Sequence, residues 1–126
     1  MKYSIEKKEK YCQMKLEEEK LNTLNAPKLK SELVLLNAEG QRNLVLDLSN
    51  VKFVDSSGLS AILIGNRLCK NANGTFVLAE LQESVLKLIK ISQLDTLLNV
   101  MPTVKEGIDF ILMEELERDL KGEEKE

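Results

Sequence analysis

The chain has 126 residues, of which 43% are apolar, and a formal net charge of −3. This size and composition predict one domain with a single hydrophobic core, which we place at residues 1–120, followed by a charged, disordered tail at 121–126. The charge balance argues against a direct nucleic-acid partner, no apolar run is long enough for membrane insertion, and the N-terminus lacks a signal-peptide core, so we expect a cytoplasmic protein.

The first half of the chain is predicted to hold three strands and one helix. In chain order these are a strand at 3–7, a strand at 11–18, a loop at 21–25, a helix that ends between 37 and 40, and a strand at 44–48. Polar and apolar residues alternate between Tyr11 and Leu16, which indicates the second strand, although its acidic end could also be helical. Asn25 can cap the helix, and Pro27 stands in its first turn, where a missing N–H has no effect.

The second half alternates helices with strands. In chain order we predict a helix from about 57 to 71, a strand at 75–79, a short helix ending near 92, a strand at 97–101 and a final amphipathic helix. The apolar face of this last helix is formed by Val104, Ile108, Ile111, Leu112, Leu116 and Leu120. The alternation predicts an α/β fold: a small mixed sheet of about five strands, parallel in its later part, with about four helices.

The most informative segment is LVLDLSNVKFVDSSGLSAIL, residues 44–63, in which an apolar strand leads to Asp55-Ser56-Ser57-Gly58 at the start of a helix. In α/β folds, sites lie at the carboxyl ends of strands. The free N–H groups and the dipole of the helix N-terminus would partly compensate a phosphate on a serine placed there. Ser and Asp are also favoured N-caps, and spacing alone favours that simpler interpretation.

The phrase DSSGL between a strand and an apolar helix resembles the signature of STAS domains of the anti-sigma factor antagonist type, and the resemblance extends from about Tyr3 to Met113. It implies a bacterial partner-switching module that sequesters an anti-sigma factor with serine kinase activity and so regulates transcription. The kinase phosphorylates the second serine of the motif, which causes release, and a serine phosphatase reverses this. Ser57 is the implied phosphorylation site. The implied partner-binding residues are Asp55, Ser56, Ser57, Gly58, Asn22 and Asn66.

One residue departs from the family pattern. In many of these antagonists the loop after the second strand reads like GELD, with its Asp facing the phosphorylated serine. This chain has Glu19-Lys20-Leu21-Asn22 in that place. Asn22 can form hydrogen bonds but has no charge, and it can equally be a loop-forming residue. We also expect Ser56 to shape the turn, and the helix face through Asn66 and Lys70 to be exposed.

Self-contained catalysis is not expected. The chain has no histidine, and it lacks the GxxxxGK[ST], GxGxxG and GxSxG patterns, so neither a general base nor a phosphate loop is visible. We therefore expect no catalytic residue, no metal and no cofactor. Two alternatives remain: a stand-alone STAS subunit of a lipid-transport or stress-sensing complex, and a small enzyme that uses Ser57 as a nucleophile.

Overall fold

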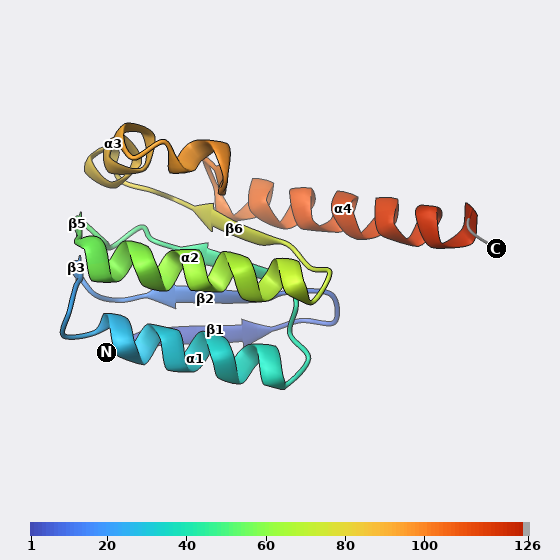
Figure 1. The fold of residues 1–126 in the computed structure, drawn as a ribbon, viewed down its shortest axis with the longest axis horizontal. Helices are drawn as coiled ribbons and strands as arrows, with labels where there is room; N and C mark the ends of the chain where they lie inside the picture. The colour runs from blue at the N-terminus through green and yellow to red at the C-terminus, as the bar shows by residue number, and fades with distance from the viewer. Residues whose placement is uncertain (125–126) are drawn as a thin grey trace.

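The chain folds into a mixed sheet with helices on both faces, as seen in a computed structural model that describes residues 1–124 (Figure 1). The elements are β1 (Tyr3–Lys7), β2 (Cys12–Leu16), β3 (Lys20–Leu21), α1 (Ala26–Ala38), β4 (Leu44–Asp47), β5 (Phe53–Val54), α2 (Ser56–Asn71), β6 (Phe76–Ala79), α3 (Glu83–Ile91), β7 (Asn99–Met101) and α4 (Val104–Glu124). A short 3-10 helix at Leu94–Thr96 lies between α3 and β7.

The main sheet has the strand order β1-β2-β4-β6-β7. β1 and β2 form an antiparallel hairpin, and β2, β4, β6 and β7 then pair in parallel. The predicted mixed α/β sheet is therefore confirmed. β3 and β5, each two residues long, pair in parallel as a separate small sheet that the sequence analysis did not anticipate.

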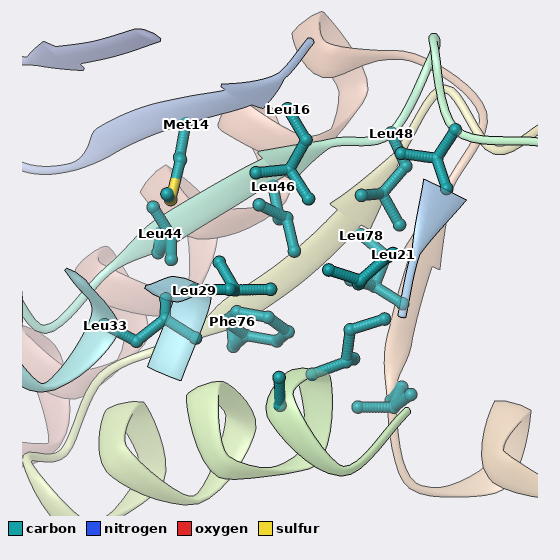
Figure 2. Packing of buried hydrophobic residues seen from close by; sticks show 14 of the residues in the cluster. Met14, Leu16, Leu21, Leu29, Leu33, Leu44, Leu46, Leu48, Phe76 and Leu78 are labelled. Atoms are coloured by element: carbon teal, nitrogen blue, oxygen red, sulfur yellow. The ribbon is translucent and has the colours of Figure 1, made fainter. Parts of the chain in front are cut away.

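The hydrophobic core lies mainly between the sheet and the pair α1 and α2 (Figure 2). Successive residues of a strand point to opposite faces, so Leu46 joins this cluster while its neighbour Val45 packs with Ile111 on the other face, beneath α4. In α1, Leu29, Leu33 and Leu36 recur at turn spacing and are all buried, as predicted.

The last helix differs from its prediction in its second half. The predicted final helix is present and Ile111 is buried, but Leu112, Leu116 and Leu120 are 38%, 52% and 50% exposed, so this part of the apolar face does not pack on the domain. Two features explain this: α4 extends past the end of the sheet (Figure 1), and Glu115, which bonds to Arg42 and Asn43, takes the place on the domain-facing side.

The helix α4 also reaches further than expected. It continues to Glu124 and so includes residues 121–124 of the segment for which we expected disorder. Residues 125 and 126 of that expected tail lie outside the described residues.

Candidate functional site

The candidate site lies where two short strands end side by side. β3 pairs in parallel with β5, with Leu21 opposite Val54, so the loop 22–25 and the residues 55–58 leave the small sheet at the same end (Figure 1). The Asp55 N–H donates to the Leu21 carbonyl oxygen at 3.1 Å, which extends the contact to the start of α2. The second sheet therefore brings a residue of the loop 22–25 against the DSSG motif.

Asp55 joins α2 to this loop. It is the N-cap of α2, and its Oδ1 accepts a hydrogen bond from the Gly58 N–H at 2.9 Å. Its Oδ2 accepts from the Thr23 N–H at 3.1 Å and from the Thr23 hydroxyl at 3.3 Å. The Gly58 N–H, together with the Thr23 donors, holds the pKa of Asp55 below its ordinary value against a smaller opposing effect of desolvation. Asp55 is therefore ionised near neutral pH.

Ser57 is the second residue of α2 and is partly exposed. Its hydroxyl oxygen lies 3.2 Å from Thr23 Oγ1. A threonine hydroxyl has one proton to donate, and Thr23 donates it to Asp55, so Ser57 is the donor in the bond between the two hydroxyls. The result is a series of hydrogen bonds in which Ser57 donates to Thr23 and Thr23 donates to the Asp55 carboxylate. Neither of these bonds uses a lone pair of Ser57 Oγ.

Gly58 allows α2 to approach β3 closely. A Cβ atom at this position would lie 2.5 Å from the Leu21 carbonyl oxygen and 2.8 Å from Val54 Cγ1. Both distances are shorter than real Cβ contacts, so only glycine fits without movement of the backbone. Ser56, the first residue of α2, is exposed, and the turn we expected it to shape is capped by Asp55 instead.

The loop 22–25 is held by its own asparagines. Asn22 Oδ1 accepts from the Leu24 N–H at 3.0 Å, and the Asn22 N–H donates to Asn25 Oδ1 at 2.8 Å. The Asn22 side chain thus folds back on its loop, which favours the loop-forming interpretation. Asn25 is the N-cap residue of α1, as predicted, but its side chain makes no cap bond to the helix. Its Nδ2 donates to the Lys20 carbonyl oxygen instead.

Thr23 is the site residue that sequence reasoning missed. It contacts both Asp55 and Ser57 although it is more than thirty residues away in the sequence. A signal was present, because Thr23 is a hydroxyl residue directly after Asn22, the position aligned with the family Asp. The parallel pairing of β3 and β5, which brings Thr23 to Ser57, could not be read from two-residue strands.

Asn66 does not belong to the exposed part of the site. We expected it on the outer face of α2, but it is only 4% exposed. It follows Ile62 by one helical turn and precedes Cys69 by nearly one, and both of those residues are buried. Asn66 therefore lies on the inner face of α2, and Lys70 is exposed as expected.

Two exposed apolar side chains flank the site in the chain. Leu24, which follows Thr23, is 91% exposed, and Phe53, two residues before Asp55, is 60% exposed. Phe53 lies in β5 opposite Lys20 of β3. Both side chains are open to contact with another molecule.

The rest of the described chain indicates little other chemistry. Residues 1–124 contain no group of His, Cys, Asp and Glu arranged to hold a metal ion, and no helix among them is both long and apolar enough to cross a membrane. The two cysteines are buried, and burial raises the pKa of Cys12 to about 11 and that of Cys69 to about 12. Neither thiol is therefore reactive near neutral pH.

Comparison with known proteins places this geometry in a family. A family model described as the STAS domain matches residues 2–107. BtrV of Bordetella bronchiseptica, which is named as an anti-sigma factor antagonist, is 33% identical over 72 residues. That match spans 57% of this chain and 62% of the relative, so it covers less than two thirds of the relative's length.

Two solved proteins share the fold. An anti-sigma factor antagonist from Mycobacterium paratuberculosis is 20% identical, with a TM-score of 0.78 over 87% of this chain and 92% of the other. The anti-sigma factor antagonist SpoIIAA in its unphosphorylated form is 17% identical, with a TM-score of 0.68 over 87% and 97%. The phosphorylated form of SpoIIAA, from Bacillus, gives the same TM-score at 18% identity over 87% and 99%.

Proposed function

The chain belongs to the STAS domain family, and we propose that it is an anti-sigma factor antagonist whose binding to its partner is switched by phosphorylation of Ser57. The proposed partner is an anti-sigma factor with serine kinase activity, and a serine phosphatase reverses the modification. One observation carries this proposal: a partly exposed serine hydroxyl lies at the start of α2 and is oriented through Thr23 toward an ionised Asp55. The likeness to BtrV and to SpoIIAA, which has been solved with and without phosphate, supports it.

The hydrogen bonds around Ser57 suit it to accept a phosphoryl group. Because Ser57 directs its proton toward Thr23, its oxygen lone pairs remain available to attack the γ-phosphorus of a nucleoside triphosphate bound to the kinase. The transfer releases the nucleoside diphosphate, and a base of the kinase takes the serine proton. The kinase brings the nucleotide and the catalytic groups, and this domain brings an oriented acceptor. A self-contained reaction at Ser57 lacks support, since no histidine is present in the chain and Asp55 is already engaged by three donors.

Phosphorylation changes the charge and the bonding of the site together. A phosphate adds about −1.5 to −2 charge at neutral pH. It would stand beside the ionised Asp55, and the Ser57 proton that now binds Thr23 would be gone. A partner surface shaped for a neutral hydroxyl would then meet a hydrated dianion. A loss of only about 3 kcal/mol weakens binding about a hundredfold, so no change of fold is required.

The proposed contact surface comprises the loop 22–25, residues 55–58 and two apolar anchors. Leu24, next to Thr23, and Phe53, two residues before Asp55, provide exposed apolar area. Apolar side chains around a polar switch are a common arrangement in protein interfaces, where the apolar groups provide affinity and the polar groups provide specificity. Asn66, which is buried, is not included.

Affinity purification tests the proposal most broadly. The full chain, tagged and expressed at native level, should retain an anti-sigma factor with a kinase domain when Ser57 is replaced by Ala and retain less of it when Ser57 is replaced by Asp. Mass spectrometry of the wild-type protein should find phosphate on Ser57 and none on Ser56. Retention of a transporter subunit or of a multi-protein stress-sensing assembly, unaffected by either substitution, would contradict the proposal and favour the alternative STAS function.

A further inference from the structure

The second half of α4 has its amphipathic pattern reversed. Four large apolar side chains of this segment are exposed: Leu112 at 38%, Met113 at 63%, Leu116 at 52% and Leu120 at 50%. Leu112, Leu116 and Leu120 are spaced by four residues, and Met113 lies next to this row, so the four side chains form one stripe along the helix, which we call the α4 stripe. An amphipathic helix that packed only on its own domain would bury such a stripe.

The side of this segment that faces the domain is polar instead. Glu115 is only 7% exposed, and its carboxylate accepts from Arg42 Nη2 at 2.8 Å and from Asn43 Nδ2 at 2.7 Å. Arg118, one turn later, bonds to Glu115 and to the Thr75 hydroxyl. These bonds fix the rotation of the helix, since turning the α4 stripe inward would break all of them and deprive the buried Asn43 and Thr75 side chains of their partners on α4.

The α4 stripe is a feature of this chain beyond the family match. The STAS family model ends at residue 107, and all four stripe residues follow it. In Figure 1 this part of α4 projects from the domain at the end opposite to the start of α2, where the candidate site lies. The stripe is therefore separate from the surface that we propose for phosphorylation-switched binding.

The charges beside the α4 stripe indicate what it fits. Glu117 and Asp119 lie on opposite sides of the stripe, Asp109 precedes it by one turn, and all three are exposed. Arg118 is turned toward the domain by its bonds to Glu115 and Thr75. Lys121, also exposed, follows Glu117 by one turn, so the flanks are acidic on balance. This disfavours pairing with a second α4, because Glu117 and Asp119 of two copies would face like charges. It also disfavours an anionic membrane surface.

We propose that the α4 stripe is a docking site for a basic amphipathic helix of a partner protein. The partner's apolar residues would cover Leu112, Met113, Leu116 and Leu120, and its flanking Lys or Arg side chains would face Glu117 and Asp119, as charges do beside the apolar seam of a coiled coil. The acidic flanks then select the partner and set the salt dependence of binding.

An NMR titration with a designed probe tests this inference. The probe is a synthetic helical peptide of about 20 residues with Leu at the seam positions and Lys at the flanking positions, and the matched peptide has Glu in place of Lys. When the Lys peptide is added to the 15N-labelled full chain, amide signals of residues 109–121 should shift, with a Kd of about 10–100 µM. This Kd should rise as the salt concentration is raised. The Glu peptide should give no shifts at the same concentration.

Substitutions locate the binding. The double variant Leu116→Gln with Leu120→Gln should lower the affinity for the Lys peptide at least tenfold. Leu35→Gln, at a 53% exposed leucine of α1, should leave that affinity unchanged. Ser57→Asp should leave it unchanged as well, which separates this inference from the proposed function. The inference is overturned if the Lys peptide gives no shifts at millimolar concentration, if both peptides bind equally, or if the unliganded chain dimerises through α4 in sedimentation experiments.

Discussion

At the residue scale, the candidate site depends on three side chains from two separate segments. Asp55 caps α2 with one carboxylate oxygen and accepts hydrogen bonds from Thr23 with the other. The Thr23 hydroxyl in turn accepts a hydrogen bond from the Ser57 hydroxyl. Each of these roles has a distinct physical basis: a fixed negative charge, a relay hydroxyl and an accessible acceptor. Two of the three, Asp55 and Ser57, are readable from the DSSG phrase, while Thr23 is visible only in three dimensions.

Thr23→Val tests the relay hydroxyl. Valine keeps the size of the side chain but cannot accept from Ser57, so the Ser57 proton loses its fixed direction. We expect the rate of Ser57 phosphorylation by the cognate kinase to fall about tenfold, as is usual when a reacting group is less well oriented. Thr23→Ser, which retains the hydroxyl, should restore most of the rate. Equal rates for wild type and Thr23→Val, measured by phosphoprotein mass spectrometry, would remove Thr23 from the mechanism.

The Asp55 carboxylate predicts a particular dependence of stability on pH. Its pKa is depressed in the folded chain, chiefly by the Gly58 N–H, so its contribution to stability is present above the unfolded pKa and is lost as pH falls through the folded pKa. The stability difference between wild type and Asp55→Asn should therefore be constant from neutral pH down to about pH 5 and shrink below about pH 4. Urea unfolding at a series of pH values measures it. A difference that grows as pH falls would be inconsistent with the assigned role.

At the scale of elements, the small β3–β5 sheet is what assembles the site. Its two backbone segments set the distance between the Thr23 loop and the first turn of α2, and Gly58 permits that distance. The large sheet positions the small one, because β4 ends just before the connection that leads to β5.

Gly58→Ala tests how closely these elements must approach. The new Cβ would stand 2.5 Å from the Leu21 carbonyl oxygen, and a backbone atom cannot turn aside as a side chain can. We expect a loss of about 1–3 kcal/mol in the free energy of unfolding. The nuclear Overhauser effects between Thr23 and Ser57 protons should also be lost. Gly122→Ala in α4 is the matched control, since a Cβ there meets nothing within 4 Å. If both variants were equally stable, the close approach would not be a constraint.

Most helices and strands could be predicted from the sequence, and a few could not. The sequence predicted β1, β2, β4, α1, α2 and β6 to within one or two residues. The signal was clearest for β2, α1 and α2, which bury residues at regular spacing. The small sheet was missed, since two residues have no period. The apolar face predicted for α4 does not pack on the domain in its second half, because apolar spacing cannot reveal that Glu115 has polar partners, Arg42 and the buried Asn43, from a distant loop. Asn66 was misplaced because its polarity suggested exposure, although its helical phase places it with Ile62.

At the scale of the whole molecule, two exposed surfaces lie at opposite ends. One comprises the loop 22–25 and residues 55–58 with Leu24 and Phe53, and the other is the α4 stripe. The core between them, from Met14 through Leu46 to Phe76, is continuous and closely packed (Figure 2). Because the surfaces share no residues, we expect substitutions at one to leave binding at the other unchanged.

Leu24→Ser tests the apolar anchor of the first surface. The side chain is 91% exposed, so its removal should not lower the free energy of unfolding by more than about 0.5 kcal/mol. Partner affinity should fall about tenfold or more, as is typical when an apolar anchor is removed from an interface. Val34→Ser, at a 52% exposed position of α1, is the matched control and should bind normally. Isothermal titration calorimetry with the purified partner compares the two, and equal losses would exclude a specific role for Leu24.

The central claim is that the charge on Ser57 controls binding, and calorimetry on three forms of the chain tests it most directly. The purified anti-sigma partner is titrated with Ser57→Ala, with Ser57→Asp and with the chain phosphorylated on Ser57. Ser57→Ala should bind as the unmodified protein does, the phosphorylated chain should bind about a hundredfold more weakly, and Ser57→Asp should fall between them because it has one charge and fewer acceptor oxygens. Equal affinity for all three forms would contradict the account.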